Sequence, residues 1–519
     1  MSAEGKAQDA WRPFLPLADY GVLGDCGSAA LVARDGSIDW LCWPRFDSEA
    51  LFARILDRRR GGFFQVAPRG AIGAERRYVG DTNVLETRFT TPAGALRMRD
   101  AMVAVPAEEQ DGPWPEHQIL RELFCERGEV EVLVRCEPRF GTGSRAARCE
   151  LRGRHGVVFQ ERELAVVLRG ELPLEAEEGV AVVGRATLRA GERRFLSLSV
   201  DTGEPATFPP LGDCARSRLE KTLAYWQRWA DRCDYEGPYR EAVVRSALLL
   251  KLLTVAPSGA LVAAPTTSLP EKVGGVRNWD YRYCWLRDAS FALDALFELG
   301  YTEEGKAFLS WLLHTTRETA PRLHVLYDVF GSAEIREREL EHLEGWRGSR
   351  PVRAGNDACS QLQLDLYGAL VDAVVQYVAR GGELDRWQQR LLARLARAIC
   401  RGWDQPDHGI WEVRSGKRCH TLSSAMCAVA LEGLLSLEAD GVLALDRSPL
   451  EQARESIRAA VERRGVAADG SFVSAMGGDE VDASLLLLGL YGYEPCDSER
   501  MQRTFARIRE RLGRGILLY

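Results

Sequence analysis

Asn83-Val84-Leu85-Glu86-Thr87-Arg88-Phe89 is a short run in which apolar and polar side chains alternate with period two. This is the pattern of a β-strand that turns one face to a core. A second run of this kind covers residues 129–135, and turn sequences such as Asp35-Gly36 and Thr91–Gly94 punctuate the chain between such runs. From residue 20 to about 210 the pattern predicts an antiparallel β-sandwich.

From Tyr239 onward the apolar period becomes that of a helix, and Ala247, Leu248 and Leu252 belong to a broad apolar face. A polar helical stretch around residues 217–231 connects the strand-rich part of the sequence to the helical part. Further helices are predicted at 287–299, 303–315, 360–379, 384–402, 420–436, 447–463, 481–490 and 499–512. We therefore predict a β-sandwich domain over residues 1–215, a helical linker over 216–236, and a domain of paired helices over 237–519.

Length and composition favour a soluble protein of two domains. A chain of 519 residues, 46% hydrophobic and 28% charged, is too long for one ordinary core. Its net charge of −7, without a basic block, argues against nucleic acid as a partner. No run approaches the roughly 18 apolar residues of a membrane span, and the polar amino terminus leads to no apolar signal core. We expect a cytoplasmic protein with no membrane partner.

The sequence predicts no cofactor and no metal. Its 13 cysteines are scattered without a CxxC pair, so disulfide frameworks and zinc ribbons are not expected, and most thiols should be small buried side chains. A P-loop, a GxGxxG motif and an HExxH motif are all absent from the sequence.

Three kinds of side chain that bind sugars occur close together in one stretch of the sequence: aromatic rings, carboxylates and guanidinium groups. The stretch is Arg277-Asn278-Trp279-Asp280-Tyr281-Arg282-Tyr283-Cys284-Trp285-Leu286-Arg287-Asp288-Ala289. Aromatic faces cover the apolar face of a pyranose, while carboxylates and guanidinium groups bind its hydroxyls. Asp288 stands where a helix should start, so it could also serve only as a helix cap. The surrounding aromatic residues favour sugar binding, because a cap needs no such wall; they are Trp279, Tyr281, Tyr283 and Trp285.

Glu412 is the predicted general acid. It follows Trp411 in Gly409-Ile410-Trp411-Glu412-Val413-Arg414, which we interpret as an extended segment. A carboxyl group against an indole is desolvated, which raises its pKa and keeps it protonated. The alternative is a strand carboxylate on the surface, paired with Arg414.

A third polar cluster covers residues 347–358 and includes Arg347, Arg350 and Arg353 around Gly, Ser and Pro. It can be a plain surface loop or a binding loop beside the pocket, and its length and glycine content favour the second interpretation. A helix that carries amide side chains, Gln361 and Gln363, is expected to follow.

With these motifs the chain resembles glycoside hydrolase family 15, the bacterial glucoamylase and trehalase branch. The resemblance runs almost from end to end, through Gly21–Cys26, Asp35–Ser48, Ala264–Pro270, the Asn278–Ala289 block, Gly345–Gln363 and Gly409–Arg414. It implies a β-sandwich followed by an (α/α)6 toroid, and inverting hydrolysis of α-glucosidic bonds that releases glucose. Trehalose or short maltooligosaccharides are the implied substrates.

The resemblance also implies roles for individual residues. Arg287 and Asp288 match the pair that holds the terminal glucose, and Glu412 matches the general acid. Tyr283 and Trp285 fall where aromatic residues line the first subsite. The remaining predicted substrate-binding residues are Trp279 and Trp411, with Arg353 and Asn356 in the loop that borders the pocket.

Two departures from the family pattern keep other functions open. Residues 421–430 are less aromatic and less basic than the family is there, and the family's general base lies in a loop beyond Tyr519. The toroid is therefore expected to be incomplete at its carboxyl-terminal end. The alternatives are a catalytically impaired sugar-binding remnant, or an α-glucoside phosphorylase in which phosphate needs no base. A homo-oligomer also stays open.

Overall fold

The structure is a computed structural model that describes residues 13–110, 114–202 and 207–518. The chain forms two compact units. The first takes in the chain up to Pro257 together with Leu261–Tyr283 and Arg336–Asn356; the second comprises Ser258–Ala260, Cys284–Ile335 and Asp357–Tyr519. This division differs from the predicted boundaries, because two later segments return to the β-unit. The predicted order, an antiparallel β-domain followed by a helical domain, is confirmed.

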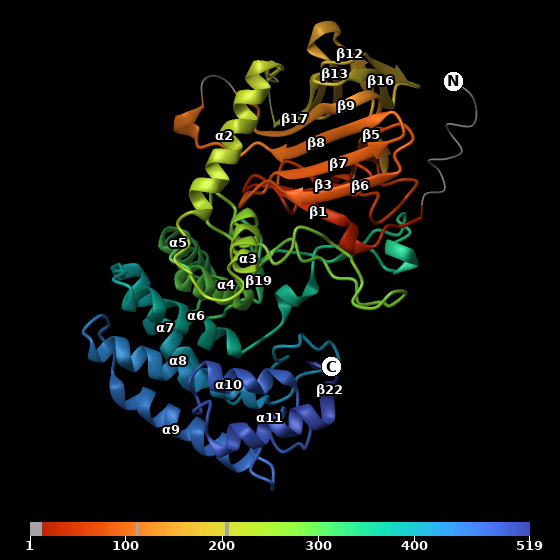
Figure 1. Ribbon diagram of the computed structural model, residues 1–519. Coiled ribbons are helices and arrows are strands. Elements are labelled where there is room, and N and C mark those ends of the chain that lie inside the picture. Colours follow the sequence, from red (N-terminus) through yellow and green to blue (C-terminus); the bar gives the residue numbers. More distant parts are fainter. Residues whose placement is uncertain (1–12, 111–113, 203–206, 519) are drawn as a thin grey trace. The chain divides into compact units, whose positions relative to one another are not determined.

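The first unit is built on antiparallel strands (Figure 1). Its longer strands are β1 Tyr20–Gly24, β2 Ala29–Ala33, β3 Ser37–Cys42, β4 Ala50–Phe52, β5 Phe63–Pro68, β6 Gly73–Tyr78, β7 Leu85–Thr91, β8 Gly94–Met102, β9 His117–Glu137, β12 Cys149–Leu151, β13 Val157–Glu161, β14 Leu164–Gly170, β15 Leu174–Glu177, β16 Ala181–Arg189 and β17 Arg193–Thr202. Short pairs are β10 Arg139–Phe140 with β11 Arg145–Ala146, and β20 Arg338–Glu339 with β21 Arg353–Ala354.

Strand β9 joins the two layers of the sandwich. Its residues up to Gly128 pair with β8 and β17, and its residues from Glu129 onward pair with β5 and β16. One continuous apolar core collects side chains from both layers, among them Ile38 and Phe64 from one and Phe89 and Leu198 from the other. Burial of alternate side chains from two facing sheets is what makes the period-two pattern fold as a sandwich.

Two helices complete the first unit, α2 Asp213–Ala230 and α3 Arg240–Leu252. The structure differs here from the predicted linker over 216–236. Ala215 and Leu219 of α2 pack in a cluster with Val84, Leu120 and Phe195 of the sheet, so α2 is a packed element rather than a spacer. Five of its seven buried residues are apolar and form the stripe that a free linker would lack, namely Ala215, Leu219, Trp226, Trp229 and Ala230.

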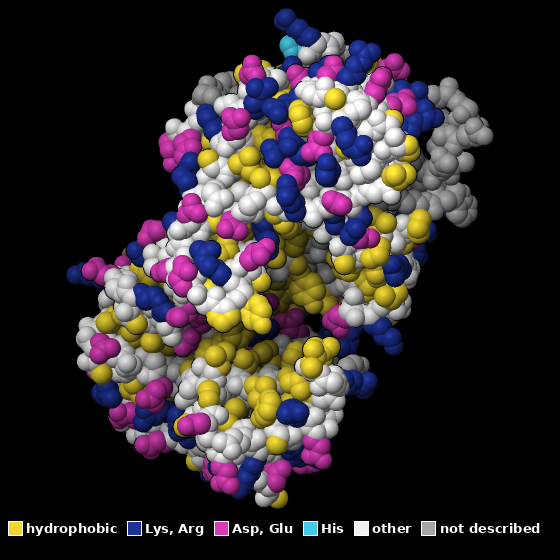
Figure 2. Space-filling model, viewed as in Figure 1, with side chains coloured by type: hydrophobic (Ala, Val, Ile, Leu, Met, Phe, Trp, Pro, Cys, Tyr) yellow, Lys and Arg dark blue, Asp and Glu magenta, His cyan; other side chains and the backbone are white. Residues whose placement is uncertain are grey.

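Charged side chains of both signs are interspersed over the visible face of the sheet unit rather than gathered by sign (Figure 2). This agrees with the small net charge of the sequence.

The second unit is helical (Figure 1). Its helices are α4 Leu286–Glu298, α5 Thr302–Thr319, α6 Asp365–Ala379, α7 Arg386–Gly402, α8 Thr421–Ala439, α9 Arg447–Arg464, α10 Leu487–Leu490 and α11 Glu499–Leu512. Two short strand pairs lie among them, β18 Cys284–Trp285 with β19 Leu326–Tyr327, and β22 Gly513–Arg514 with β23 Leu517–Leu518. Helix α4 packs on α5 and α6, and α8 packs on α6 and α9.

Two helices differ from the predicted ranges. The helix predicted over 360–379 begins only at Asp365, because a 3-10 turn covers Asp357–Ser360 and residues 361–364 are held by side chains from elsewhere. The helix predicted over 481–490 is a 3-10 turn, Ala483–Leu486, followed by the single turn α10. The late start of α6 arises where tertiary contacts override a local apolar pattern.

Helix α8 is the core helix of the second unit. By length and composition α8 could cross a membrane, but 67% of its apolar segment is buried inside the protein. Burial against α6 and α9 is the ordinary reason for such an apolar helix in a globular domain.

Candidate active site

Glu412 lies in a tight turn of the second unit, and its backbone is in the left-handed region with φ of 54°. The turn runs from Gly409, whose φ is 65°, and the Glu412 N–H donates to the Gly409 carbonyl at 3.2 Å. The prediction of an extended segment around Glu412 is therefore wrong. A Cβ on Gly409 would lie 2.8 Å from the His420 ring, so the turn requires glycine. Glutamate rarely adopts positive φ, so the contacts around this turn must offset a cost in backbone conformation.

The indole that covers the Glu412 carboxyl group comes from Trp285. Trp285 Nε1 donates to Glu412 Oε1 at 2.8 Å, and the Trp285 side chain is almost completely buried. Trp411, the predicted neighbour, is 59% exposed. Trp285 thus supports the carboxyl group instead of offering an open ring face, the role predicted for it. Its position is fixed because β18 pairs with β19 just before α4 begins.

Arg287 contacts three carboxyl groups of the site. Its buried guanidinium group lies 3.1 Å from Asp365 Oδ2, 3.5 Å from Glu412 Oε1 and 3.7 Å from Asp288 Oδ1. One positive charge facing three carboxyl groups cannot neutralise all of them. Protonation of one carboxyl group is therefore favoured over full ionisation.

Burial raises the pKa of Glu412, although the Arg287 charge and the Trp285 hydrogen bond oppose this shift. The Glu412 side chain keeps 23% of its surface exposed. A carboxyl group whose pKa is raised and which still reaches solvent is suited to act as a general acid. The alternative of a strand carboxylate paired with Arg414 loses its basis, since Glu412 is in a turn and faces Arg287.

Asp288 lies in the first turn of α4 and does not cap the helix with its side chain. The N-cap residue is Trp285, which also makes no side-chain cap. The Asp288 side chain is 46% exposed, yet the surrounding protein raises its pKa by desolvation, against the opposing charge of Arg287. An accessible carboxylate beside a guanidinium group is suited to sugar hydroxyls.

Two amides close a ring of hydrogen bonds around the acid. Arg287 Nη1 donates to Gln363 Oε1 at 2.8 Å, and Gln363 Nε2 donates to Gln361 Oε1 at 3.2 Å. Gln361 Nε2 in turn donates to the Glu412 carbonyl at 3.1 Å. The sequence showed these amides but placed them in a helix, whereas they precede α6. The ring fixes both the backbone and the carboxyl group of Glu412.

Asp365 and Asp407 are site residues that the sequence analysis missed. Asp365, the first residue of α6, is the closest carboxylate to Arg287. Asp407 Oδ2 accepts from the Leu364 N–H at 2.9 Å and from Ser423 Oγ at 2.8 Å, so it holds the segment that carries the amides. Burial raises the pKa of Asp407 to about 7. An acidic residue before a glycine turn gives no local signal of such a role.

The other predicted substrate-binding residues belong to the first unit. The Arg353 guanidinium group lies 4.6 Å from the centre of the Trp279 ring and donates to the carbonyls of Val276 and Asn278 at 3.0 and 3.2 Å. Asn356 donates to the Asp280 carbonyl at 3.2 Å, and Tyr283 is buried. These contacts tie one loop of the unit to another. Their predicted roles in sugar binding stay predictions.

No group of three or more His, Cys, Asp or Glu side chains that could hold a metal ion occurs within residues 13–110, 114–202 and 207–518. All 13 cysteines are free thiols, eight of them buried.

The β-sheet unit, the helical unit and a partly buried carboxyl group held between an indole and a guanidinium group are features of a glycoside hydrolase. A family model described as glycosyl hydrolases family 15 matches residues 237–518, and one described as trehalase-like, N-terminal matches residues 14–104. The chain belongs to glycosyl hydrolase family 15.

Curated relatives match most of the chain. The trehalase of Mycolicibacterium smegmatis is 37% identical over 96% of this chain and 78% of its own length. The trehalase of Thermoplasma volcanium is 33% identical over 95% of this chain and 78% of its own length. A solved structure of a wild-type glycosidase is 22% identical and covers 52% of this chain and 69% of its own, with a TM-score of 0.41.

Proposed function

We propose that this protein hydrolyses the α-glucosidic bond of trehalose with inversion and releases glucose. The observation that carries the proposal is the hydrogen bond of 2.8 Å from the Trp285 indole to the Glu412 carboxyl group, beside the Arg287 guanidinium group. Similarity to two curated trehalases, 37% and 33% identical to this chain, supports trehalose as the substrate.

In this mechanism Glu412 gives its proton to the glycosidic oxygen as the bond to the departing glucose breaks. Arg287 and Asp288 bind hydroxyls of the glucose whose anomeric carbon reacts, because one donates and the other accepts at the same edge of the site. Water forms the new bond to the anomeric carbon from the face opposite the departing oxygen and gives its proton to a second carboxylate, the base that inversion requires about 6.5–9.5 Å from the acid. Hydrogen bonds to Gln361 and Gln363 keep the acid in place while charge develops.

The role of Glu412 is tested by replacing it with glutamine and changing the leaving group. Glu412→Gln should lower trehalose hydrolysis by roughly 10²–10⁴-fold, the usual contribution of general acid–base assistance. The same variant should retain most of its activity on α-D-glucosyl fluoride, since fluoride departs without being protonated. Glu432→Gln, on the surface of α8 and 59% exposed, is the matched control and should behave as wild type.

The outcomes separate the possible functions. Equal loss on both substrates would contradict the acid role of Glu412, and full activity on trehalose would exclude it. A folded wild-type protein that releases no glucose from trehalose would overturn the proposed function. Faster hydrolysis of maltose than of trehalose would move the assignment to a glucoamylase-like α-glucosidase.

A further inference from the structure

Helix α7 carries charge of one sign on one of its faces. It contains no aspartate or glutamate, and its arginines follow one another at intervals of four, four, three and four residues. At about 100° of rotation per residue, this spacing puts them within an arc of about 80° around the helix axis. All of these side chains are exposed, and together they are called the α7 arginine row: Arg386, Arg390, Arg394, Arg397 and Arg401.

The opposite face of α7 is apolar and packs inside the second unit, where α7 contacts α5 and α8 (Figure 1). Leu391, Leu395 and Ile399 are among the side chains buried there. This packing holds α7 in place, so the arginine row starts from a fixed backbone. Because the apolar face is already covered, recognition by α7 depends on the row and its exposed neighbours.

The α7 arginine row is not neutralised inside the protein. Among the residues that the structure describes, no carboxylate lies within ion-pair distance of its five guanidinium groups. Arg394 donates to the Ala320 carbonyl, and the Arg390 guanidinium group lies 4.9 Å from the centre of the Trp387 ring. Neither contact supplies a negative charge. The acidic residues nearest in sequence stand beyond the ends of the helix, at Glu383, Asp385 and Asp404.

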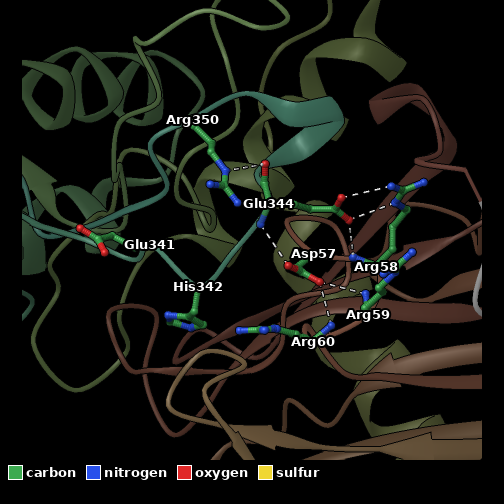
Figure 3. Close-up of a pocket in the computed structure, with 8 residues that line it drawn as sticks. All are labelled: Asp57, Arg58, Arg59, Arg60, Glu341, His342, Glu344 and Arg350. Atoms are coloured by element: carbon green, nitrogen blue, oxygen red, sulfur yellow. Dashed lines mark hydrogen bonds and ion pairs between the residues drawn. The ribbon is translucent and has the colours of Figure 1, made fainter.

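Arginines on other parts of the protein commonly have a partner. On α11 of the same unit, Arg500 lies 2.8 Å from Glu462. In the arginine-lined cavity of the first unit, Arg58 donates to the Glu344 carboxylate at 3.0 and 3.1 Å, and Arg350 donates to the Glu344 carbonyl at 3.4 Å (Figure 3). The row on α7 differs from both, because its charge is directed to the outside.

The row lowers the stability of the helix that carries it. Like charges four residues apart on a helix repel each other, as Arg386 and Arg390 do, and Arg397 and Arg401. Arg386 is also the first residue of α7, where the positive end of the helix dipole disfavours a cation. Arg401, in the last turn, is favourably placed with respect to the dipole. Helix stability therefore gives no reason for the whole row, whereas an anionic partner does.

We propose that the α7 arginine row docks on the surface of an anionic lipid bilayer. At about 1.5 Å of rise per residue the row extends over about 22 Å, so a flat surface contacts all of its side chains at once. Basic side chains close to anionic headgroups are attracted by the surface potential. Trp387, which is 60% exposed at one end of the row, is of the residue type preferred between headgroups and acyl chains.

A nucleic acid is the other polyanion that such a row attracts. The net charge of −7 opposes it, because a long strand would pass from this helix onto a surface of its own sign. Docking on a bilayer needs no segment that spans it, and it departs from the expectation of no membrane partner, which rested on the lack of such a segment. The proposal goes beyond the hydrolysis of trehalose and does not depend on it.

Sedimentation of lipid vesicles with the full chain tests the docking. At low ionic strength the protein should bind vesicles of equal parts phosphatidylcholine and phosphatidylserine, and should not bind vesicles of phosphatidylcholine alone. Binding should fall steeply as salt is raised toward about 1 M, where charges are screened beyond about 3 Å.

The triple variant Arg386→Gln/Arg397→Gln/Arg401→Gln removes charges that make no contact with a carboxylate in the described part of the chain. It should lower the partition coefficient on phosphatidylserine vesicles by about 100-fold, since each arginine near an anionic surface contributes about fivefold. Trp387→Ala should also weaken binding, but should leave its dependence on lipid charge unchanged. Circular dichroism checks that each variant is folded.

A matched control removes the same number of charges from α11. Arg500→Gln/Arg503→Gln/Arg511→Gln should leave the partition coefficient within about twofold of wild type, because charges away from the docking face are screened. Each of these arginines is paired with a carboxylate. The partners are Glu462, Glu499 and Asp479.

Several results would overturn the proposal. One is the absence of binding to phosphatidylserine vesicles at low ionic strength, and another is equal binding to both kinds of vesicle. Equal losses in the α7 and α11 triple variants would show that net charge alone decides the binding. Complete displacement from the vesicles by single-stranded RNA at the same phosphate concentration would assign the row to a nucleic acid instead.

Discussion

Trp285 and Glu412 are joined by a hydrogen bond of 2.8 Å across 127 positions of the chain. The bond links the start of α4 to the turn before α8, and both elements lie in the second unit. Because the indole N–H donates to the carboxyl oxygen, it stabilises the ionised form and opposes the effect of burial on the Glu412 pKa. Burial and the Trp285 hydrogen bond therefore shift the Glu412 pKa in opposite directions, and mutation of Trp285 can separate the two effects.

Replacing Trp285 with phenylalanine should shift the activity of the enzyme to higher pH. A general acid works below its pKa, so the descending limb of the kcat/KM profile follows Glu412. Trp285→Phe removes the hydrogen-bond donor that lowers the Glu412 pKa, so the descending limb should move to higher pH. At the acidic plateau kcat/KM should fall by roughly tenfold, the value of one hydrogen bond. Trp411→Phe is the matched control, and its limb should not move.

Asp365→Asn should shift the same limb in the opposite direction. Asparagine keeps an oxygen for Arg287 but removes the negative charge that lies 3.1 Å from it. The guanidinium charge then acts more strongly on Glu412 and lowers its pKa, so the descending limb should move to lower pH. A pH profile of kcat/KM measures this. Movement of the Trp285→Phe and Asp365→Asn limbs in the same direction would contradict the assigned electrostatic network.

The ion pair of Asp280 and Arg282 should matter for stability rather than for turnover. Arg282 donates to both carboxylate oxygens of Asp280 at 2.8 and 2.7 Å, and both residues are buried in the first unit. Asp280→Ala leaves a buried guanidinium group without its counter-charge, which should lower the free energy of unfolding by about 3–5 kcal/mol.

Urea denaturation followed by circular dichroism measures the effect of Asp280→Ala. Arg277→Gln breaks an exposed pair with Glu271, at 3.7 Å, and should change the stability by no more than about 0.5 kcal/mol. Equal effects of the two substitutions would show that the buried pair adds nothing specific.

Sequence patterns located the elements and predicted the reacting groups, but not the contacts between them. Period two and the helical period gave the sandwich and the helices, because each element must bury one face. The motifs identified Glu412, Arg287 and Asp288. The indole partner was predicted as adjacent Trp411, whereas the fold supplies Trp285 from 127 positions away. No local pattern reports such a contact.

The turn at Glu412 and the late start of α6 have similar causes. Glutamate rarely adopts positive φ, so its residue type argues against the observed turn. The segment 361–364 has helical periodicity, but hydrogen bonds from Asp407 and the amide ring hold it in another conformation. Both misjudged segments surround the acid, where function and local preference conflict.

Asp407 gives a pH dependence to the stability of the second unit. Burial raises its pKa from 3.8 to about 7, so the folded protein holds a proton here that the unfolded chain has released. Between these two values the native state binds more protons, and the free energy of unfolding must fall as pH rises. The contribution is present at about pH 4 and is lost by about pH 7, and it amounts to at most about 4 kcal/mol.

Asp407→Asn keeps an acceptor for Leu364 and Ser423 but cannot ionise, so urea denaturation of this variant should show a flatter dependence on pH. Asp404→Asn, an exposed neighbour, should retain the slope of the wild type, and a slope unchanged in Asp407→Asn would show that another group carries it.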